Sequence, residues 1–222
     1  MTELSVCPTQ ASPEPEHERW GQRLSRSYGV DAEAETLKLL SSSLDKLAPT
    51  IDARAIDHAG HMPESALRAL REAGLFALTI PEDCGGLGLS LKAACPVIER
   101  LAQLDRSLAV SVGLHCGLGT QGIVRYAHED QRQELLPLLA SGEWIGAFAT
   151  TEAGAGSDLM AISTTGLPAP GGLRVSGQKC YVTNGALANC YTVLVRTPEH
   201  GGSRAQTLVC IPREAAGVHV GK

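Results

Sequence analysis

The first half of the chain places its apolar residues at the spacing of amphipathic helices. Between residues 32 and 47, leucines recur at steps of three and four positions, and similar steps follow Pro63 as far as Gly74. Such steps put the apolar side chains on one face of a helix. Ser90 is the expected cap of one helix and Gly74 the expected stop of another. The pattern predicts helices over residues 32–47, 63–73, 90–102, 108–126 and 129–141.

Prolines modify this pattern at three places. Pro96 lies inside the third predicted helix, and it predicts either a kink or a later start, because proline lacks the N–H that a helix interior uses. Pro137 is a similar irregularity in the fifth helix. Residues 1–30 contain several prolines and little apolar periodicity. We therefore expect a flexible leader over residues 1–30.

The residue pattern of the second half of the chain is typical of β-strands. Gly becomes denser after residue 145, and the net charge changes from negative to positive, which predicts a domain boundary there. No helical period separates the apolar runs, which disfavours a parallel β-α-β sheet and favours an antiparallel barrel or sandwich. The sequence thus predicts an α+β protein with an all-helical N-terminal domain over 31–145 and a β domain over 146–222. The expected strands are 145–150, 173–175, 180–183, 191–196 and 207–211.

Composition excludes several classes of protein. Hydrophobic residues make up 43% of the 222 residues and charged residues 19%, as in a folded globular chain. The net charge of -5 has the wrong sign for a nucleic-acid binder. No apolar run approaches the roughly 20 residues of a membrane span, and the first residues lack the pattern of a secretory signal.

The cysteines and histidines do not predict a metal site. Asp57, His58 and His61 are expected to lie in a polar turn without further ligands, and His115 is expected to be a packed core histidine. The cysteines are odd in number, scattered and never spaced C-x-x-C, which favours reduced thiols in the cytoplasm over a disulfide framework or zinc site. The seven are Cys7, Cys84, Cys95, Cys116, Cys180, Cys190 and Cys210.

Two motifs carry candidate chemistry. The first, FATTEAGAGSD over residues 148–158, combines hydroxyl side chains with small residues and matches neither the phosphate-loop nor the dinucleotide fingerprint. It predicts either a tight surface loop or a loop whose N–H groups approach an anionic or planar ligand.

The second motif is GQKCYVTNG over residues 177–185. In a strand, Tyr181 and Thr183 would share one face, where they could stack against a ring and hydrogen-bond to its edge. The same residues also fit an ordinary strand that ends at an Asn184-Gly185 hairpin turn.

With the loop PEDCGGLGLS at residues 81–90, these motifs make the chain resemble the acyl-CoA dehydrogenase family of flavoproteins. The matching stretches run in the order of that family: LREAGLFALTIPEDCGGLGLS, QELLPLLASGEWIGAFATTEAGAGSD and VSGQKCYVTNGALANCYTVLVRT. The resemblance covers about residues 35–222.

The resemblance implies an FAD site. Thr150 and Thr151 match positions at the pyrimidine edge of the flavin, and Ser157 matches a serine beside both flavin and acyl thioester, so it is also the expected substrate-binding residue. Tyr181 matches an aromatic residue, often Trp, that packs on the flavin, and Thr183 a hydroxyl near N5. The expected FAD-binding residues are Phe148, Thr150, Thr151, Gly156, Ser157, Tyr181, Val182 and Thr183.

Two positions depart mildly from the family. Ala153 stands where the family usually has Pro, and Phe148 where it often has Tyr. Glu152 is acidic and lies between the expected flavin contacts, but the resemblance assigns it to the loop scaffold rather than to catalysis.

The implied reaction is α,β-dehydrogenation of an acyl-CoA thioester. A carboxylate removes the α-proton, a hydride passes from the β-carbon to FAD, and electrons continue to an electron-transferring flavoprotein. In the family the base is a Glu of a C-terminal helical domain beyond the truncated β domain seen here, so no catalytic residue is expected in this chain. Activity is then expected to need a complementary chain in a homo- or hetero-oligomer.

Two other functions stay open. One is a non-catalytic subunit that binds flavin or an acyl thioester as a scaffold. The other is a dehydrogenase or oxidase that acts on an acyl-carrier-protein thioester.

Overall fold

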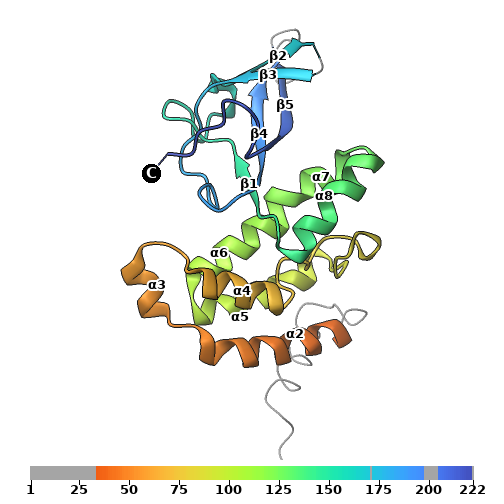
Figure 1. Ribbon diagram of the computed structural model, residues 1–222, viewed down its shortest axis with the longest axis vertical. Helices are drawn as coiled ribbons and strands as arrows, with labels where there is room; N and C mark the ends of the chain where they lie inside the picture. Colours follow the sequence, from red (N-terminus) through yellow and green to blue (C-terminus); the bar gives the residue numbers. More distant parts are fainter. Residues whose placement is uncertain (1–33, 171, 198–204, 222) are drawn as a thin grey trace, which may run out of the picture.

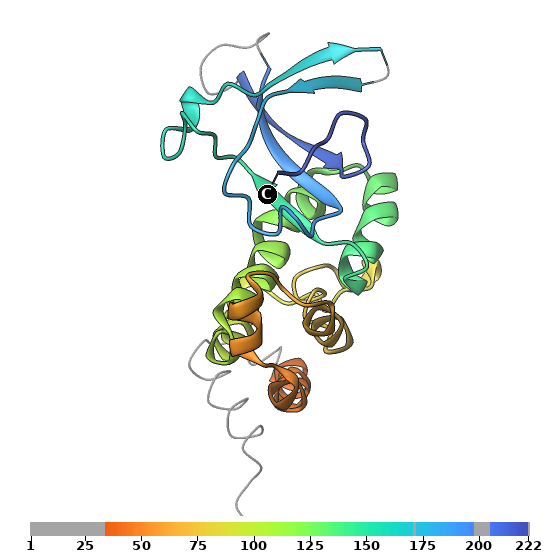
Figure 2. The ribbon, with the colours of Figure 1, turned by 60° about the vertical axis from the view of Figure 1, so that its left-hand side comes forward.

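The computed structural model describes residues 34–170, 172–197 and 205–221. The leader expected over 1–30 lies outside the described residues. Figures 1 and 2 show helices gathered at one end of the molecule and strands at the other. The predicted α+β class is confirmed.

The first helices follow the leucine pattern. Helix α2 (Ala34–Leu47) buries its leucines at steps of three and four. Helix α4 (Glu64–Glu72) begins directly after Pro63, and Gly74 follows its end with φ of 70°, a left-handed conformation that favours glycine. Both the start and the stop were predicted.

A short helix, α3 (Ala53–Ala59), was not predicted. The Asp52 side chain caps it by accepting a hydrogen bond from the N–H of Ala55. Asp57 and His58 therefore lie in a helix rather than in the expected polar turn. Only seven residues long, it is too short to show a clear apolar period.

Helix α5 (Leu91–Leu104) begins where Ser90 predicted. The Ser90 hydroxyl accepts a hydrogen bond from the N–H of Ala93 at 3.1 Å. Pro96 lies within the helix, so the later start that it suggested is wrong. The later helices of the described residues include α6 (Arg106–Leu114), a wide π-helical turn at His115–Gly119, α7 (Thr120–Tyr126) and α8 (Glu129–Ser141). Short 3-10 helices lie at Ala48–Thr50, Glu82–Cys84 and Leu159–Ala161.

The continuous helix expected over residues 108–126 is interrupted by the π-helical turn. Gly117 departs from helical dihedral angles there. By length and composition alone, Arg106–Tyr126 is apolar enough to cross a membrane, although no such run was expected from the sequence. Half of its most apolar window is buried within the fold. Core helices meet the same criterion, so this is weak evidence for a span.

Strand β4 (Cys190–Arg196) organises the sheet. β1 (Gly146–Ala149) pairs with β4 in parallel, and β5 (Gln206–Pro212) pairs with it antiparallel. β2 (Thr165–Ala169) and β3 (Gly172–Ser176) form an antiparallel hairpin, and β2 joins β4 in parallel. The sheet is mixed, which corrects the antiparallel prediction. The long connection between β1 and β4 lets the chain return in the same direction without an α-helix.

Two strand predictions need correction. Residues 180–183 are a loop, because Tyr181 and Asn184 adopt left-handed backbone angles, with φ of 55° and 64°. Strand β2 was missed, since its sequence TGLPA contains a Gly and a Pro, which are disfavoured in strands.

Buried polar contacts join the helices to the sheet. The Gly146 N–H donates to Nδ1 of His115 at 2.9 Å, and the Thr192 hydroxyl donates to the carbonyl of Gly119 at 3.2 Å. A Cβ added to Gly119 would lie 3.0 Å from the backbone of Gly146. Glycine at position 119 therefore permits the close approach of the π-helical turn to β1.

Candidate functional site

The two motifs singled out from the sequence lie side by side. The chain leaves β1 and enters the glycine-rich segment 150–157, which lies against the segment before Tyr181. The Cys180 N–H donates to the carbonyl of Thr151 at 2.9 Å, and Lys179 Nζ donates to the carbonyl of Thr150 at 3.0 Å. The backbone of one motif is thus fixed by the other.

The carboxylate of Glu152 holds this arrangement together. Its Oε2 accepts hydrogen bonds from the Ser163 N–H at 2.7 Å and hydroxyl at 2.6 Å. Its Oε1 accepts from the Thr164 N–H at 2.9 Å and hydroxyl at 2.5 Å. Lys179 Nζ lies 2.8 Å from the same oxygen, and the side chains of Lys179 and Glu152 are only 8% and 6% exposed. Five donors therefore converge on one buried carboxylate.

These donors determine the charge of Glu152. Burial alone would raise the pKa of its carboxyl, but the hydrogen bonds from Lys179, Ser163 and Thr164 outweigh burial and hold that pKa well below its usual range. An ionised carboxylate saturated with donors is a weak proton acceptor. Glu152 therefore acts as loop scaffold, as the sequence resemblance assigned it.

Around this scaffold, the expected ligand-binding residues are open to solvent to different degrees. Gly156 and Ser157 are exposed, and a Cβ at Gly154 or Gly156 would meet no heavy atom within 4 Å. The site is therefore an open surface of hydroxyl groups and small residues. The half-buried members are Phe148, Thr150, Thr151, Val182 and Thr183.

Tyr181 is the unusual member of this surface. Its side chain is 92% exposed, and its φ of 55° is a left-handed angle that bulky residues rarely adopt. Such a conformation costs on the order of 1–3 kcal/mol and is concentrated at ligand sites. Because this segment is a loop, Tyr181 and Thr183 do not share the strand face that the sequence suggested.

Asn184 anchors the Tyr181 loop to the helices. Its Nδ2 donates to the Ser111 carbonyl at 2.9 Å, and its Oδ1 accepts from the Ser111 hydroxyl at 2.6 Å. Asn184 therefore fixes a loop against α6 rather than turning a hairpin. The anchors of the site were not predicted from the sequence. The one signal that could have found them is the acidic Glu152 among small residues, because a carboxylate that becomes buried needs donors or a cation. The missed residues are Ser111, Ser163, Thr164, Lys179 and Asn184.

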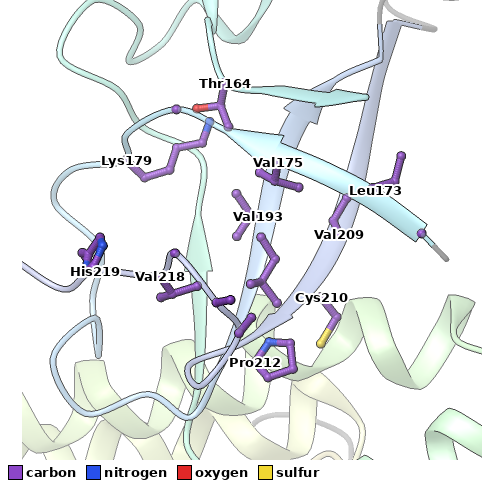
Figure 3. A pocket seen from close by; sticks show the side chains of 16 residues that line it. Thr164, Leu173, Val175, Lys179, Val193, Val209, Cys210, Pro212, Val218 and His219 are labelled. Atoms are coloured by element: carbon purple, nitrogen blue, oxygen red, sulfur yellow. The ribbon is translucent and has the colours of Figure 1, made fainter. Parts of the chain in front are cut away.

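The stem of Lys179 also borders an apolar cavity on one face of the sheet. The cavity has a volume of ≈ 590 Å³ and lies over β3, β4 and β5. In Figure 3, Val175, Val193 and Val209 line it, and the Lys179 nitrogen points toward Thr164 at its margin. Lys179 therefore contributes methylene groups to the cavity and its ammonium group to the Glu152 cluster.

Among residues 34–170, 172–197 and 205–221, no group of three or more His, Cys, Asp or Glu side chains could hold a metal ion. His115 is fully buried, which confirms the prediction of a packed core histidine.

Comparison with known proteins identifies the fold. The family model described as acyl-CoA dehydrogenase, N-terminal domain, matches residues 42–143, and the model for the middle domain of the same family matches residues 147–222. The chain belongs to the acyl-CoA dehydrogenase family. The resemblance inferred from the motifs is thereby confirmed.

Individual members of the family agree with this result. The very long-chain specific acyl-CoA dehydrogenase of Macaca fascicularis is 36% identical over 137 residues, which cover 61% of this chain and 21% of that protein. The benzylmalonyl-CoA dehydrogenase of Aromatoleum aromaticum is 33% identical over 178 residues, covering 80% of this chain and 46% of that protein. The chain thus spans less than half the length of these relatives.

Solved acyl-CoA dehydrogenase structures share the fold. The enzyme from Geobacillus kaustophilus superposes with a TM-score of 0.72 and 29% identity over 94% of this chain and 51% of its own. The enzyme from Bacillus anthracis, solved in complex with FAD, gives a TM-score of 0.64 and 26% identity over 96% of this chain and 33% of its own.

Proposed function

We propose that this chain forms the flavin-binding part of an FAD-dependent acyl-CoA dehydrogenase. The observation that carries the proposal is the buried Lys179–Glu152 pair, because it fixes segment 150–157 beside the Tyr181 loop. The two segments share this anchor but leave their hydroxyls, small residues and one aromatic ring accessible. That combination suits a large planar ligand with a polar edge.

The residues present fit the flavin of FAD. Open space above Gly154 and Gly156 lets a ring system approach the backbone closely. The hydroxyls of Thr150, Thr151 and Thr183 can each donate or accept a hydrogen bond, which matches the alternating donors and acceptors of the flavin pyrimidine ring.

When bound, FAD supplies a hydride acceptor for oxidation of the acyl group. The chain itself positions the cofactor. Donors fixed in advance stabilise negative charge without reorganising, and the Glu152 cluster provides this rigidity for segment 150–157. The exposed ring of Tyr181 supplies a stacking surface, and the Ser157 hydroxyl is accessible for a thioester.

The proton acceptor of the reaction is not assigned to the described residues. Glu152 is unsuitable because its carboxylate is saturated with donors and its pKa is depressed. We assign the substrate as an acyl-CoA thioester, in agreement with the names of the acyl-CoA dehydrogenase relatives. The electron acceptor that we propose is an electron-transferring flavoprotein, as the family resemblance implies.

Titration of the purified chain with FAD tests this proposal. Saturable quenching of flavin fluorescence is expected, and a panel of acyl-CoA thioesters then separates the enzyme from a scaffold. Because no proton acceptor is assigned to the described residues, the thioesters are added with and without a separately expressed C-terminal helical domain of the family. Bleaching of the bound flavin by one thioester in either mixture supports the dehydrogenase, whereas flavin binding without bleaching in both supports a non-catalytic subunit. Absence of flavin binding would contradict the proposed flavin-binding function.

A further inference from the structure

Two thiols outside the proposed flavin surface meet on adjacent strands. Cys190 begins β4 and Cys210 lies in β5, and their Sγ atoms are 2.7 Å apart. The strand register pairs Thr192 with Cys210, so the two cysteines are diagonal neighbours on one face of the sheet. In Figure 3 the Cys210 sulfur points away from the cavity-lining valines and toward the helices.

The two thiols differ in their access to solvent. Cys190 is 1% exposed and packs in an apolar cluster that includes Ile123 of α7 and Leu136 of α8. Cys210 is exposed. A small oxidant in solution therefore reaches Cys210 first, while Cys190 is held in contact with it and shielded from other reagents.

The contact also favours Cys210 as the nucleophile. Its hydrogen bond with Cys190 lowers the pKa of the Cys210 thiol, although burial opposes this effect. The same hydrogen bond raises the pKa of Cys190, and burial raises it further. Since the thiolate is the reactive form of cysteine, the exposed member of the pair is also the more reactive one.

We propose that Cys190 and Cys210 form an oxidisable pair, which hydrogen peroxide converts into a disulfide that links β4 to β5. The Cys210 thiolate attacks one peroxide oxygen and forms a sulfenic acid, while the other oxygen leaves as hydroxide and takes up a proton to become water. The Cys190 sulfur then attacks the Cys210 sulfur, and the hydroxyl leaves as a second water with the Cys190 proton. Two thiols lose two electrons, and one peroxide is reduced to two waters.

The disulfide would constrain the segment between two cysteines that are 20 positions apart in the sequence. Cross-linking a loop of this length disfavours the unfolded chain. Oxidation is therefore expected to raise Tm by roughly 5–10 °C. This expectation does not depend on flavin binding.

Peptide mapping tests the proposal on the intact chain. The protein is treated with one equivalent of hydrogen peroxide, alkylated and cleaved with trypsin, which yields peptides 180–196 and 205–213. The expected product is a cross-link between these peptides within one chain, with the loss of two hydrogen atoms. Because Cys180 shares a peptide with Cys190, the C180S variant must still form the link.

Matched variants test whether Cys190 and Cys210 are the cysteines that form the disulfide. C95S removes an exposed cysteine on α5 and should leave both the cross-link and the rise in Tm unchanged, whereas C210S should abolish both. Since Cys210 is exposed, C210S is expected to fold, and its Tm without peroxide checks this. Recovery of alkylated Cys190 and Cys210 after peroxide, a link through Cys180, or a link only between chains would overturn the proposal.

Discussion

Lys179 Nζ lies 2.8 Å from Oε1 of Glu152, and this ion pair joins two segments that are 27 positions apart in the sequence. Both side chains are buried, so each charge depends on the other for its stability. The pair matters for function because the backbone on either side of it carries the proposed flavin contacts.

Replacing Lys179 by Met should strongly destabilise the β part of the chain. Removing one partner of a buried ion pair leaves the other charge without compensation, which typically costs about 3–5 kcal/mol. Urea unfolding measures the loss. The K92M variant is the matched control, because Lys92 is exposed at the start of α5, and a loss as large in K92M as in K179M would contradict this account.

Tyr181→Gly should weaken flavin binding without loss of stability. Glycine adopts the φ of 55° freely, so the free energy of unfolding should stay constant or increase. The stacking surface disappears, and FAD affinity should fall by about tenfold. Tyr126→Ala is the control, since Tyr126 is 81% exposed on α7. Unchanged FAD affinity in Y181G would exclude Tyr181 from the site.

Gly119→Ala should destabilise the chain by about 1–3 kcal/mol, as overpacking of a tight contact does. The added Cβ would lie 3.0 Å from the backbone of Gly146, which cannot move without shifting β1. Gly113→Ala is the contrasting control in α6, where the nearest atom is a side-chain carbon of Ile98 at 3.7 Å. There, alanine should stabilise the helix by about 0.5–1 kcal/mol.

Protonation of His115 should make stability depend on pH. Burial lowers the pKa of His115 to about 4, from 6.5 in the unfolded chain. Between these values the unfolded state binds the extra proton, so stability is present above pH 6.5 and decreases as the pH falls toward 4. The loss should reach about 3 kcal/mol.

Urea unfolding at several pH values measures this dependence, and His115→Gln should flatten it between pH 6.5 and 4.5. The depressed pKa of Glu152 adds a loss of stability only below its ordinary value of 4.5. His115 and Glu152 therefore affect the stability of the chain in largely separate pH ranges. A slope that persists in H115Q between pH 6.5 and 4.5 would show that another group is responsible.

The sequence predicts the local features of this fold well. The leucines of α2 and the Ser90 cap of α5 depend on neighbours within one or two turns, and both lie where the pattern placed them. The burial of His115 also followed from the apolar helix around it.

The features that the sequence did not predict depend on distant contacts. The aromatic and β-branched residues at 181–183 have the composition of a strand, but Asn184 bonds to Ser111, 73 positions away, and holds them in a loop. The parallel pairing of β1 with β4 likewise depends on the path of a long connection. The hydrogen-bond donors around Glu152 come from two later segments of the chain, and no periodicity in the sequence predicts these donors.

Hydrogen exchange of the backbone amides, measured with and without saturating FAD, shows directly whether FAD binds against segment 150–157 and the Tyr181 loop. Bound FAD should slow exchange in segment 150–157 and in residues 180–184, with little change in α2 and α4. Unchanged exchange in both segments under conditions where FAD is bound would place the flavin elsewhere and exclude this surface as its site.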